Sequence, residues 1–341
     1  MAPRSAYRPF AVTLVERRQL SRNFVRLTFA GPDLSEFADT CLDQRIKLVL
    51  GTDAQLDEAA AAPSWLDWWR DQPNDERPTM RTYTARFVRR EEAQVDVDFV
   101  THGTTGPASR FAIEAPVGAR AILVGAYADH PEADTQGLAW RRAGASTVLL
   151  AGDETAQPAI ANILRSLPAH VTGAAFLEVT HPDDAMPLET AAEVAVTYLP
   201  RSTGETGTGE DGTGEDGAGE DGAGEDGADS ADADAAGEGH ARGTRLTEAV
   251  RDWTQAWTAE AEGSAEAAGA SGADDIDADV TTTETGILWE EGAEGGGLRV
   301  WVAADAGTVR GLRQVLLKEQ GLDRKSCSFM GYWRLGAREG E

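Results

Sequence analysis

The chain has 341 residues, of which 41% are apolar, and this is enough for the cores of two domains of ordinary size. Its formal net charge of −27 argues against a nucleic-acid partner, because binding to phosphates requires a basic surface. There is no apolar run of about 18 residues, and the segment Met1 to Phe10 lacks the apolar stretch of a signal peptide. We therefore expect no membrane insertion and a cytoplasmic location.

The first third of the chain has the pattern of short strands separated by turns. The expected strands lie at 10–15, 24–30, 46–50, 96–100 and 121–124. Such a series predicts an antiparallel barrel, which we assign to residues 1–135. Trp65, Trp68 and Trp69 fall in a stretch rich in Asp and Pro. We expect this stretch to be a loop that packs against the barrel, with a lid as the alternative.

From residue 136 onward, strands alternate with helices. The expected strands lie at 146–151, 174–180, 193–199 and 298–303, and the expected helices at 154–167 and 308–320. This alternation predicts a parallel sheet, so residues 136–341 form an α/β domain. Arg310 and Arg313 are expected on the solvated face of the last helix.

A strongly acidic stretch interrupts the second domain. Residues 203–227 repeat Gly-Glu-Asp, and 201–240 contain thirteen acidic side chains against one basic side chain, Arg201. This composition cannot bury a core, which predicts a disordered insert at about 201–285. Calcium-binding repeats are the alternative, but they interleave apolar residues that are missing here. One amphipathic helix, at 245–257, divides the insert and is expected to pack on the core, with a partner-binding helix as the alternative.

Two cysteines, Cys41 and Cys327, are expected to be ordinary thiols. An iron–sulfur cluster requires about four thiolates, so this chain cannot build one alone. Any redox chemistry must therefore come from a bound organic cofactor or from a metal that the chain does not itself hold.

Two strings of residues carry candidate binding chemistry. In the first, Arg81-Thr82-Tyr83-Thr84, the arginine can clamp a phosphate, and the tyrosine lies on the same strand face. In the second, residues 98–112 are a strand, a Gly-rich turn and the start of a helix. Free N–H groups and the dipole at such a helix start can receive a pyrophosphate. A plain strand and a plain tight turn are the alternatives.

These strings occur in an order typical of one family. They are followed by LLAGDETAQPAI at 149–160, RGLRQVLLKEQGLDR at 310–324 and GYWRLG at 331–336. On these motifs, the chain resembles the siderophore-interacting protein family of ferredoxin reductase-like flavoproteins. The resemblance covers about residues 8–200 and 286–336. The HG…GPAS and GDET strings are specific to the family, whereas RxYT is shared across the superfamily.

The resemblance implies an antiparallel FAD-binding barrel followed by a parallel-sheet NAD(P)-binding domain. It implies that Arg81 holds the FAD pyrophosphate, that Tyr83 packs on the isoalloxazine ring and that Thr84 bonds near the reactive edge of that ring. Further implied cofactor contacts come from Thr82, Val100, His102, Gly103, Gly106, Ala108 and Ser109. The last implied set faces the nicotinamide or the far side of the flavin and consists of Asp153, Glu154, Thr155 and Ala156.

The resemblance also indicates how substrate binds. Ferric siderophores are often anionic, so a cationic pocket beside the flavin makes physical sense. Lys47 and Arg334 match basic positions of the family, and a salt-bridged surface charge is the alternative for each. Two positions depart from the family pattern: Gln157 replaces a common Leu, and Asp305 replaces a common Glu.

The predicted activity is reduction of Fe(III) in a ferric siderophore by electrons from NADPH or NADH, which pass through FAD. No catalytic acid or base and no protein-bound metal are expected. The alternatives are ferredoxin as electron donor and a siderophore-binding module without turnover. Glu178 would favour NADH by accepting from a ribose hydroxyl, whereas Arg201 would favour NADPH by pairing with its 2′-phosphate.

Overall fold

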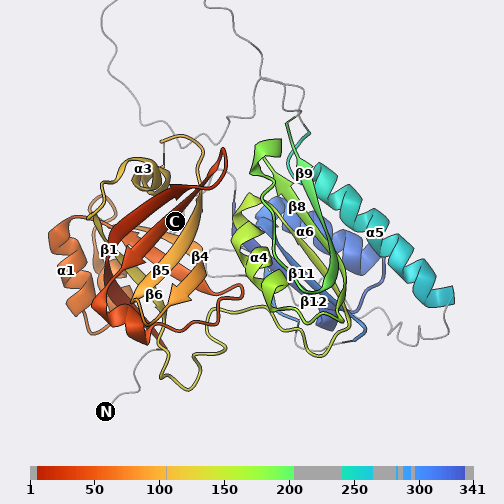
Figure 1. Ribbon diagram of the computed structural model, residues 1–341, viewed down its shortest axis with the longest axis horizontal. Helices are drawn as coiled ribbons and strands as arrows, with labels where there is room; N and C mark the ends of the chain where they lie inside the picture. The colour runs from red at the N-terminus through yellow and green to blue at the C-terminus, as the bar shows by residue number, and fades with distance from the viewer. Residues whose placement is uncertain are drawn as a thin grey trace, which may run out of the picture.

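The computed structural model describes residues 6–104, 106–202, 240–263, 282, 287–292 and 296–334. These residues form a closed β-barrel and an α/β domain that lie side by side (Figure 1). The predicted architecture, an antiparallel barrel followed by a domain with a parallel sheet, is confirmed. None of the helices within these ranges is long and apolar enough to cross a bilayer.

Six antiparallel strands close the barrel in the order β1-β2-β5-β4-β3-β6. They are β1 (Tyr7–Gln19), β2 (Phe24–Ala30), β3 (Arg45–Leu50), β4 (Thr79–Arg89), β5 (Gln94–Val100) and β6 (Arg120–Ala126). Side chains alternate between the two faces of each strand, and the inward set forms one buried core. Phe10, Leu27, Ile46, Val97 and Leu123 belong to this core.

Helices cover the outside of the barrel: η1 (Pro32–Glu36), α1 (Asp53–Ala61), α2 (Trp65–Asp71) and α3 (Pro107–Glu114). The tryptophan-rich stretch is helix α2, so the predicted loop is wrong. Ser64 caps this helix by accepting the N–H of Asp67 at 3.4 Å. The predicted packing on the barrel is confirmed, because Trp69 is buried beside Met80 and donates to the carbonyl of Pro78 at 2.8 Å.

The second domain is built on a six-stranded sheet in the order β10-β12-β11-β7-β8-β9. Its strands are β7 (Thr147–Gly152), β8 (Thr172–Val179), β9 (Glu193–Pro200), β10 (Trp289–Glu290), β11 (Leu298–Asp305) and β12 (Cys327–Trp333). All neighbours are parallel except β10, which is antiparallel to β12. The parallel strands therefore end at one common edge of the sheet.

Helices pack on both faces of this sheet. They are η2 (Glu154–Ala156), α4 (Gln157–Ser166), η3 (Pro182–Asp184), α5 (Thr244–Gly263), α6 (Ala306–Gln314), the π-helical η4 (Val315–Glu319) and η5 (Arg324–Ser326). Helix α4 covers the face toward the barrel, and α5 lies on the far side (Figure 1). A separate hydrophobic core fills each face.

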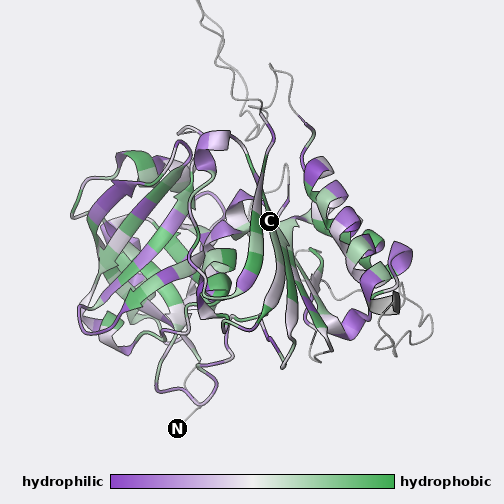
Figure 2. Cartoon of the chain, turned by 45° about the vertical axis from the view of Figure 1, so that its right-hand side comes forward, coloured by the Kyte–Doolittle hydropathy of each residue, from purple (hydrophilic) through white to green (hydrophobic). Residues whose placement is uncertain are grey.

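Helix α5 lies within the predicted insert but belongs to the folded domain. It extends beyond the predicted 245–257, and its residues Leu246 and Val250 are fully buried in the core. It carries hydrophobic and hydrophilic side chains together (Figure 2). This part of the 201–285 stretch is therefore not a disordered insert. The rest of that prediction falls on 203–239, 264–281 and 283–286, which lie outside the described residues.

The described residues on either side of 203–239 lie close together. The N–H of His240 donates to the carbonyl of Arg201 at 3.0 Å.

Replacing 203–239 with a short Gly-Ser linker should leave the urea unfolding midpoint and the FAD content unchanged, because the acidic segment cannot supply a core. Leu246→Ala is the comparison, with an expected loss of about 2–5 kcal/mol. A linker variant that unfolds as early as Leu246→Ala, or that loses FAD, would contradict this expectation.

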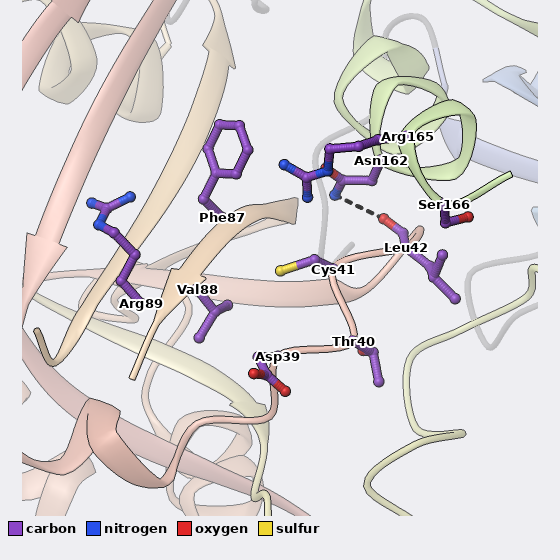
Figure 3. Close-up of a pocket in the computed structure, with 10 residues that line it drawn as sticks. All are labelled: Asp39, Thr40, Cys41, Leu42, Phe87, Val88, Arg89, Asn162, Arg165 and Ser166. Atoms are coloured by element: carbon purple, nitrogen blue, oxygen red, sulfur yellow. Dashed lines mark hydrogen bonds between the residues drawn. The ribbon is translucent and has the colours of Figure 1, made fainter. Parts of the chain in front are cut away.

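Asn162 of α4 joins the two domains. Its Nδ2 donates to the carbonyls of Leu42 at 3.0 Å and Ala85 at 2.9 Å. Beside this contact lies a groove of about 420 Å³, where the guanidinium of Arg165 is 4.6 Å from the ring centroid of Phe87 (Figure 3). None of the predicted cofactor or substrate residues lines the groove, so the candidate site lies elsewhere.

Candidate cofactor and substrate site

Strand β4 presents its Arg-Thr-Tyr-Thr motif on two faces. Arg81 and Tyr83 share one face, and the ring of Tyr83 contacts Phe99 of β5 at a centroid distance of 4.3 Å. The half-buried guanidinium of Arg81 donates to the carbonyl of Met80 at 2.8 Å. Within the described ranges, no carboxylate forms an ion pair with Arg81. Its remaining N–H groups suit a phosphate.

The two threonines of the motif lie on the opposite face of β4. Thr82 accepts a hydrogen bond from Nζ of Lys47, which faces it on β3. Thr84 is only 5% exposed, so the protein covers most of its hydroxyl. Alternation along the strand therefore separates Thr82 and Thr84 from the Arg81–Tyr83 face.

The start of α3 is open to a ligand. Its N-cap is Gly106, which has no side chain to occupy the free N–H groups of the first turn, where Ala108 and Ser109 lie. Gly103 in the preceding turn has a φ of +70°, a conformation that favours glycine. A Cβ added at Gly103 or Gly106 would meet no described atom within 4 Å. The N–H groups and the helix dipole favour an anion in this space.

The β4–β5 hairpin brings these features to one side of the barrel. Helix α3 packs against both strands, and its Phe111 stacks on Phe29 at 6.4 Å. Val100, half-buried, ends β5 just before the Gly-rich turn. A cation, a free helix start and the half-buried ring of Tyr83 thus lie on neighbouring elements. This set fits FAD, whose pyrophosphate and flat ring require such partners.

His102 links the barrel to the second domain. It follows β5, and its Nε2 lies 3.8 Å from Oε1 of Glu154. Glu154 begins η2 at the end of β7, and η2 also packs against β5. The Gly-rich turn of the barrel and the GDET string of the α/β domain therefore meet. This is the edge at which open parallel sheets bind nucleotides.

Glu154 is the centre of a buried ion-pair network. It is 2% exposed and accepts from Arg201 at 2.9 and 3.0 Å and from Arg242 at 3.0 Å. Burial alone would raise the pKa of Glu154. The hydrogen bonds and charge of Arg201, together with Arg242, outweigh burial and lower this pKa to about 2. Glu154 is thus held as a carboxylate by its own chain.

Asp153 is saturated by donors from three segments. Its Oδ1 accepts the N–H of Thr155 at 2.9 Å, and its Oδ2 accepts the N–H of Asp305 at 2.9 Å and Nε1 of Trp333 at 2.8 Å. Burial, reinforced by the charge of Glu154, raises the pKa of Asp153 to about 6. Ala156 is fully buried. Asp153, Thr155 and Ala156 therefore shape the edge of the sheet.

Glu178 and Arg201, the residues considered for nicotinamide selectivity, bind each other. Nη1 of Arg201 lies 3.3 Å from Oε1 of Glu178, and both side chains are buried. Glu178 also accepts the N–H of Gly243 at 2.9 and 3.0 Å. The structure thus gives both residues internal partners.

Strand β3, which carries Lys47, and strand β12, which Arg334 follows, are joined by contacts to Trp289. The guanidinium of Arg45, two residues before Lys47, is 4.0 Å from the ring centroid of Trp289. Trp289 stacks on Tyr332, two residues before Arg334, at 6.2 Å. Arg334 is exposed at the end of β12. Neither the Arg45–Trp289 contact nor the ring stack could be predicted from the local sequence.

The burial and the hydrogen bonding of Gln157 could not be predicted from the sequence. Its side chain is 1% exposed, and neither Oε1 nor Nε2 has a hydrogen-bond partner in the described part of the chain. A buried polar group left without a partner costs about 1–3 kcal/mol. Gln157 begins α4, directly after the Asp153–Ala156 string.

Comparison with known proteins agrees with this geometry. Residues 13–130 match the siderophore-interacting FAD-binding domain, and residues 145–213 and 229–336 match the siderophore-interacting protein family. The structure of the siderophore-interacting protein SipS from Aeromonas hydrophila is similar, with a TM-score of 0.58 and 21% identity over 98% of this chain and 95% of SipS. A siderophore utilization protein from T. fusca has a TM-score of 0.56 and 20% identity over 99% and 97% of the two chains.

Two curated relatives are similar in sequence. An uncharacterized protein of Mycobacterium tuberculosis is 36% identical over 195 residues, which is 56% of this chain and 65% of the relative. The aligned part thus spans slightly less than two thirds of that relative. Ferric vibriobactin reductase ViuB of Vibrio cholerae is 27% identical over 199 residues, 58% of this chain and 68% of ViuB. Because the two family matches together span most of the sequence, the chain belongs to the siderophore-interacting protein family.

Proposed function

We propose that this protein is an FAD-dependent reductase that uses NAD(P)H to reduce Fe(III) in a ferric siderophore. The proposal rests on two candidate sites that meet where the barrel contacts the carboxyl edge of the parallel sheet. On the barrel are Arg81 and the open start of α3, and on the sheet is the nucleotide edge at Glu154. One dinucleotide could occupy each site. The name of the relative ViuB supports the same substrate class.

In this proposal, the chain binds and positions rather than transfers protons. Bound FAD supplies the chemistry of accepting a hydride and releasing electrons singly. Arg81 and the N–H groups of α3 would hold the pyrophosphate, and Tyr83 would cover a face of the flat ring. Iron is substrate, and it leaves after reduction because siderophores hold Fe(II) weakly. We place this reaction in the cytoplasm, where nicotinamide nucleotides are available.

The test is anaerobic stopped-flow reduction of the FAD-loaded protein by NADH, NADPH and reduced ferredoxin, followed by addition of a ferric siderophore with an Fe(II) chelator. Fast flavin bleaching by a nicotinamide nucleotide, then coloured Fe(II) chelate, is expected. Bleaching by ferredoxin alone would assign a different electron donor. A colourless protein, or one that binds the ferric siderophore without forming Fe(II), would indicate a module without turnover.

The two basic residues that the family resemblance implies for substrate binding give a prediction on substrate. If Lys47 and Arg334 attract an anionic ferric siderophore, replacing both with Ala should raise its KM while flavin reduction by NAD(P)H stays the same. The wild-type rate should also fall with salt, because exposed charges are screened over about 10 Å at 0.1 M. The matched control is Arg90→Ala/Arg310→Ala, which removes two exposed positive charges elsewhere. Equal KM values for both double variants would exclude the basic pocket.

A further inference from the structure

Two buried side-chain amides on α4, those of Gln157 and Asn162, differ in whether the chain itself supplies their hydrogen-bond partners. Gln157 and Asn162 are each 1% exposed. Asn162 donates to the carbonyls of Leu42 and Ala85 and accepts from Arg86 at 2.7 Å, so its amide is fully used. Gln157 has a partner on neither its oxygen nor its nitrogen among the described residues. Buried polar groups are nearly always paired, so Gln157 calls for a partner from outside the chain.

The position of Gln157 indicates which ligand lies near. A Cβ at Gly152 would lie 2.5 Å from Cβ of Ala156 and 2.7 Å from the carbonyl of Ala303, so the turn before α4 packs directly on the strand ends. The preceding η2 also packs against β5 of the barrel, and its Glu154 lies 3.8 Å from His102. Gln157 directly follows η2, the segment at which the nucleotide edge of the sheet meets the barrel.

The donor and acceptor atoms of the amide limit which part of a dinucleotide can be its partner. A glutamine amide presents N–H donors beside a carbonyl acceptor. Phosphate oxygens only accept, so a phosphate would leave Oε1 of Gln157 unpaired. Adenine, the pyrimidine part of flavin and the nicotinamide carboxamide each place an N–H donor next to an acceptor atom.

We propose that Gln157 binds such a donor–acceptor edge of a dinucleotide, either FAD or the nicotinamide nucleotide. This rests on the proposed function, which brings both to this edge. Without the dinucleotide, the amide is removed from water and receives no bond in return. Gln157→Leu, a change of similar size, should therefore stabilise the empty protein and weaken dinucleotide binding. Asn162→Leu should destabilise the empty protein, because its amide is used by the chain itself.

The experiment compares wild type, Gln157→Leu and Asn162→Leu. Urea unfolding midpoints are measured on flavin-free protein, FAD affinity by flavin fluorescence, and the affinities for NAD⁺ and NADP⁺ by calorimetry on the FAD-loaded protein. We expect the midpoint of Gln157→Leu to equal or exceed that of wild type, and that of Asn162→Leu to fall. For Gln157→Leu, the Kd of one dinucleotide should rise about tenfold, which is about 1.4 kcal/mol. The Kd that rises identifies the ligand.

Two results would overturn the inference: unchanged Kd values for both dinucleotides, or a Gln157→Leu protein that is destabilised like Asn162→Leu. Gln157→Met, which keeps the length of the side chain without its polar atoms, must repeat the result in either case. If wild type binds neither FAD nor either nicotinamide nucleotide, the proposed function and this inference fall together. If wild type binds both and the Gln157 variants bind equally well, only the inference falls.

Discussion

Replacing Arg81 with alanine should weaken FAD binding by about 10- to 150-fold while the fold is kept. The guanidinium is half-buried on β4 and donates to the Met80 carbonyl at 2.8 Å. Its other N–H groups are thus in place for the FAD pyrophosphate, and a hydrogen bond to a charged group contributes about 1.5–3 kcal/mol. The measurement is the Kd of FAD for flavin-free protein, with circular dichroism to verify the fold.

Two variants separate loss of this contact from a general loss of charge. Arg90→Ala removes an exposed arginine from the turn after β4, where it donates to the carbonyl of Ser35 at 2.8 Å, and should bind FAD normally. Arg81→Lys should be intermediate, because lysine keeps the charge but not the planar fork of donors. A full complement of FAD in Arg81→Ala, at wild-type affinity, would show that the pyrophosphate is held by other groups.

Replacing Arg201 with methionine should lower the free energy of unfolding of the second domain by about 3–5 kcal/mol at neutral pH. Arg201 is 4% exposed and pairs with Glu154 at 2.9 Å and with Glu178 at 3.3 Å. Removing it leaves two carboxylates buried, with Arg242 as the nearest remaining cation of the network. Urea unfolding followed by tryptophan fluorescence measures the loss.

A surface ion pair of similar length is the control. Arg251 lies 3.0 Å from Glu319, but the two side chains are 33% and 41% exposed. Arg251→Met should therefore cost no more than about 1 kcal/mol, since water screens such a pair. Adding Glu154→Gln to Arg201→Met should recover part of the stability by removing one unpaired charge. Equal losses in Arg201→Met and Arg251→Met would argue that the buried network is not needed for stability.

The same network sets an expected dependence on pH. The pKa of Glu154 is lowered from 4.5 to about 2 in the folded protein, so its contribution is present above pH 4.5 and is lost as the pH falls toward 2. The pKa of Asp153 is raised from 3.8 to about 6, so this group adds stability as the pH falls from 6 toward 3.8. In Arg201→Met, the part of the unfolding free energy that Glu154 loses on acidification should be smaller than in wild type.

The sequence by itself determined the order of the domains and most of the regular elements. Alternating strands in the first third and strand–helix alternation later reflect periods of two and 3.6 residues, which are local properties. The strings at Arg81 and Gly106 were likewise readable, because a strand face and a helix start are set by neighbouring residues. Helices α1 and α2 were not predicted, since helices of nine and seven residues are too short to show a clear period of 3.6 residues.

Only the tertiary structure decided which charged groups bind each other. Glu154, Glu178 and Arg201 come from three separate segments, and Arg201 was expected to remain available for a ligand. Arg313 was expected on a solvated face, but it is 7% exposed and donates to Glu290 at 3.1 Å. Such pairs form where the sheet brings together strand ends that are far apart in the sequence. Burial then keeps the opposite charges paired, because an unpaired buried charge is costly. No local pattern carries that information, because the partners are chosen by the packing of the whole domain.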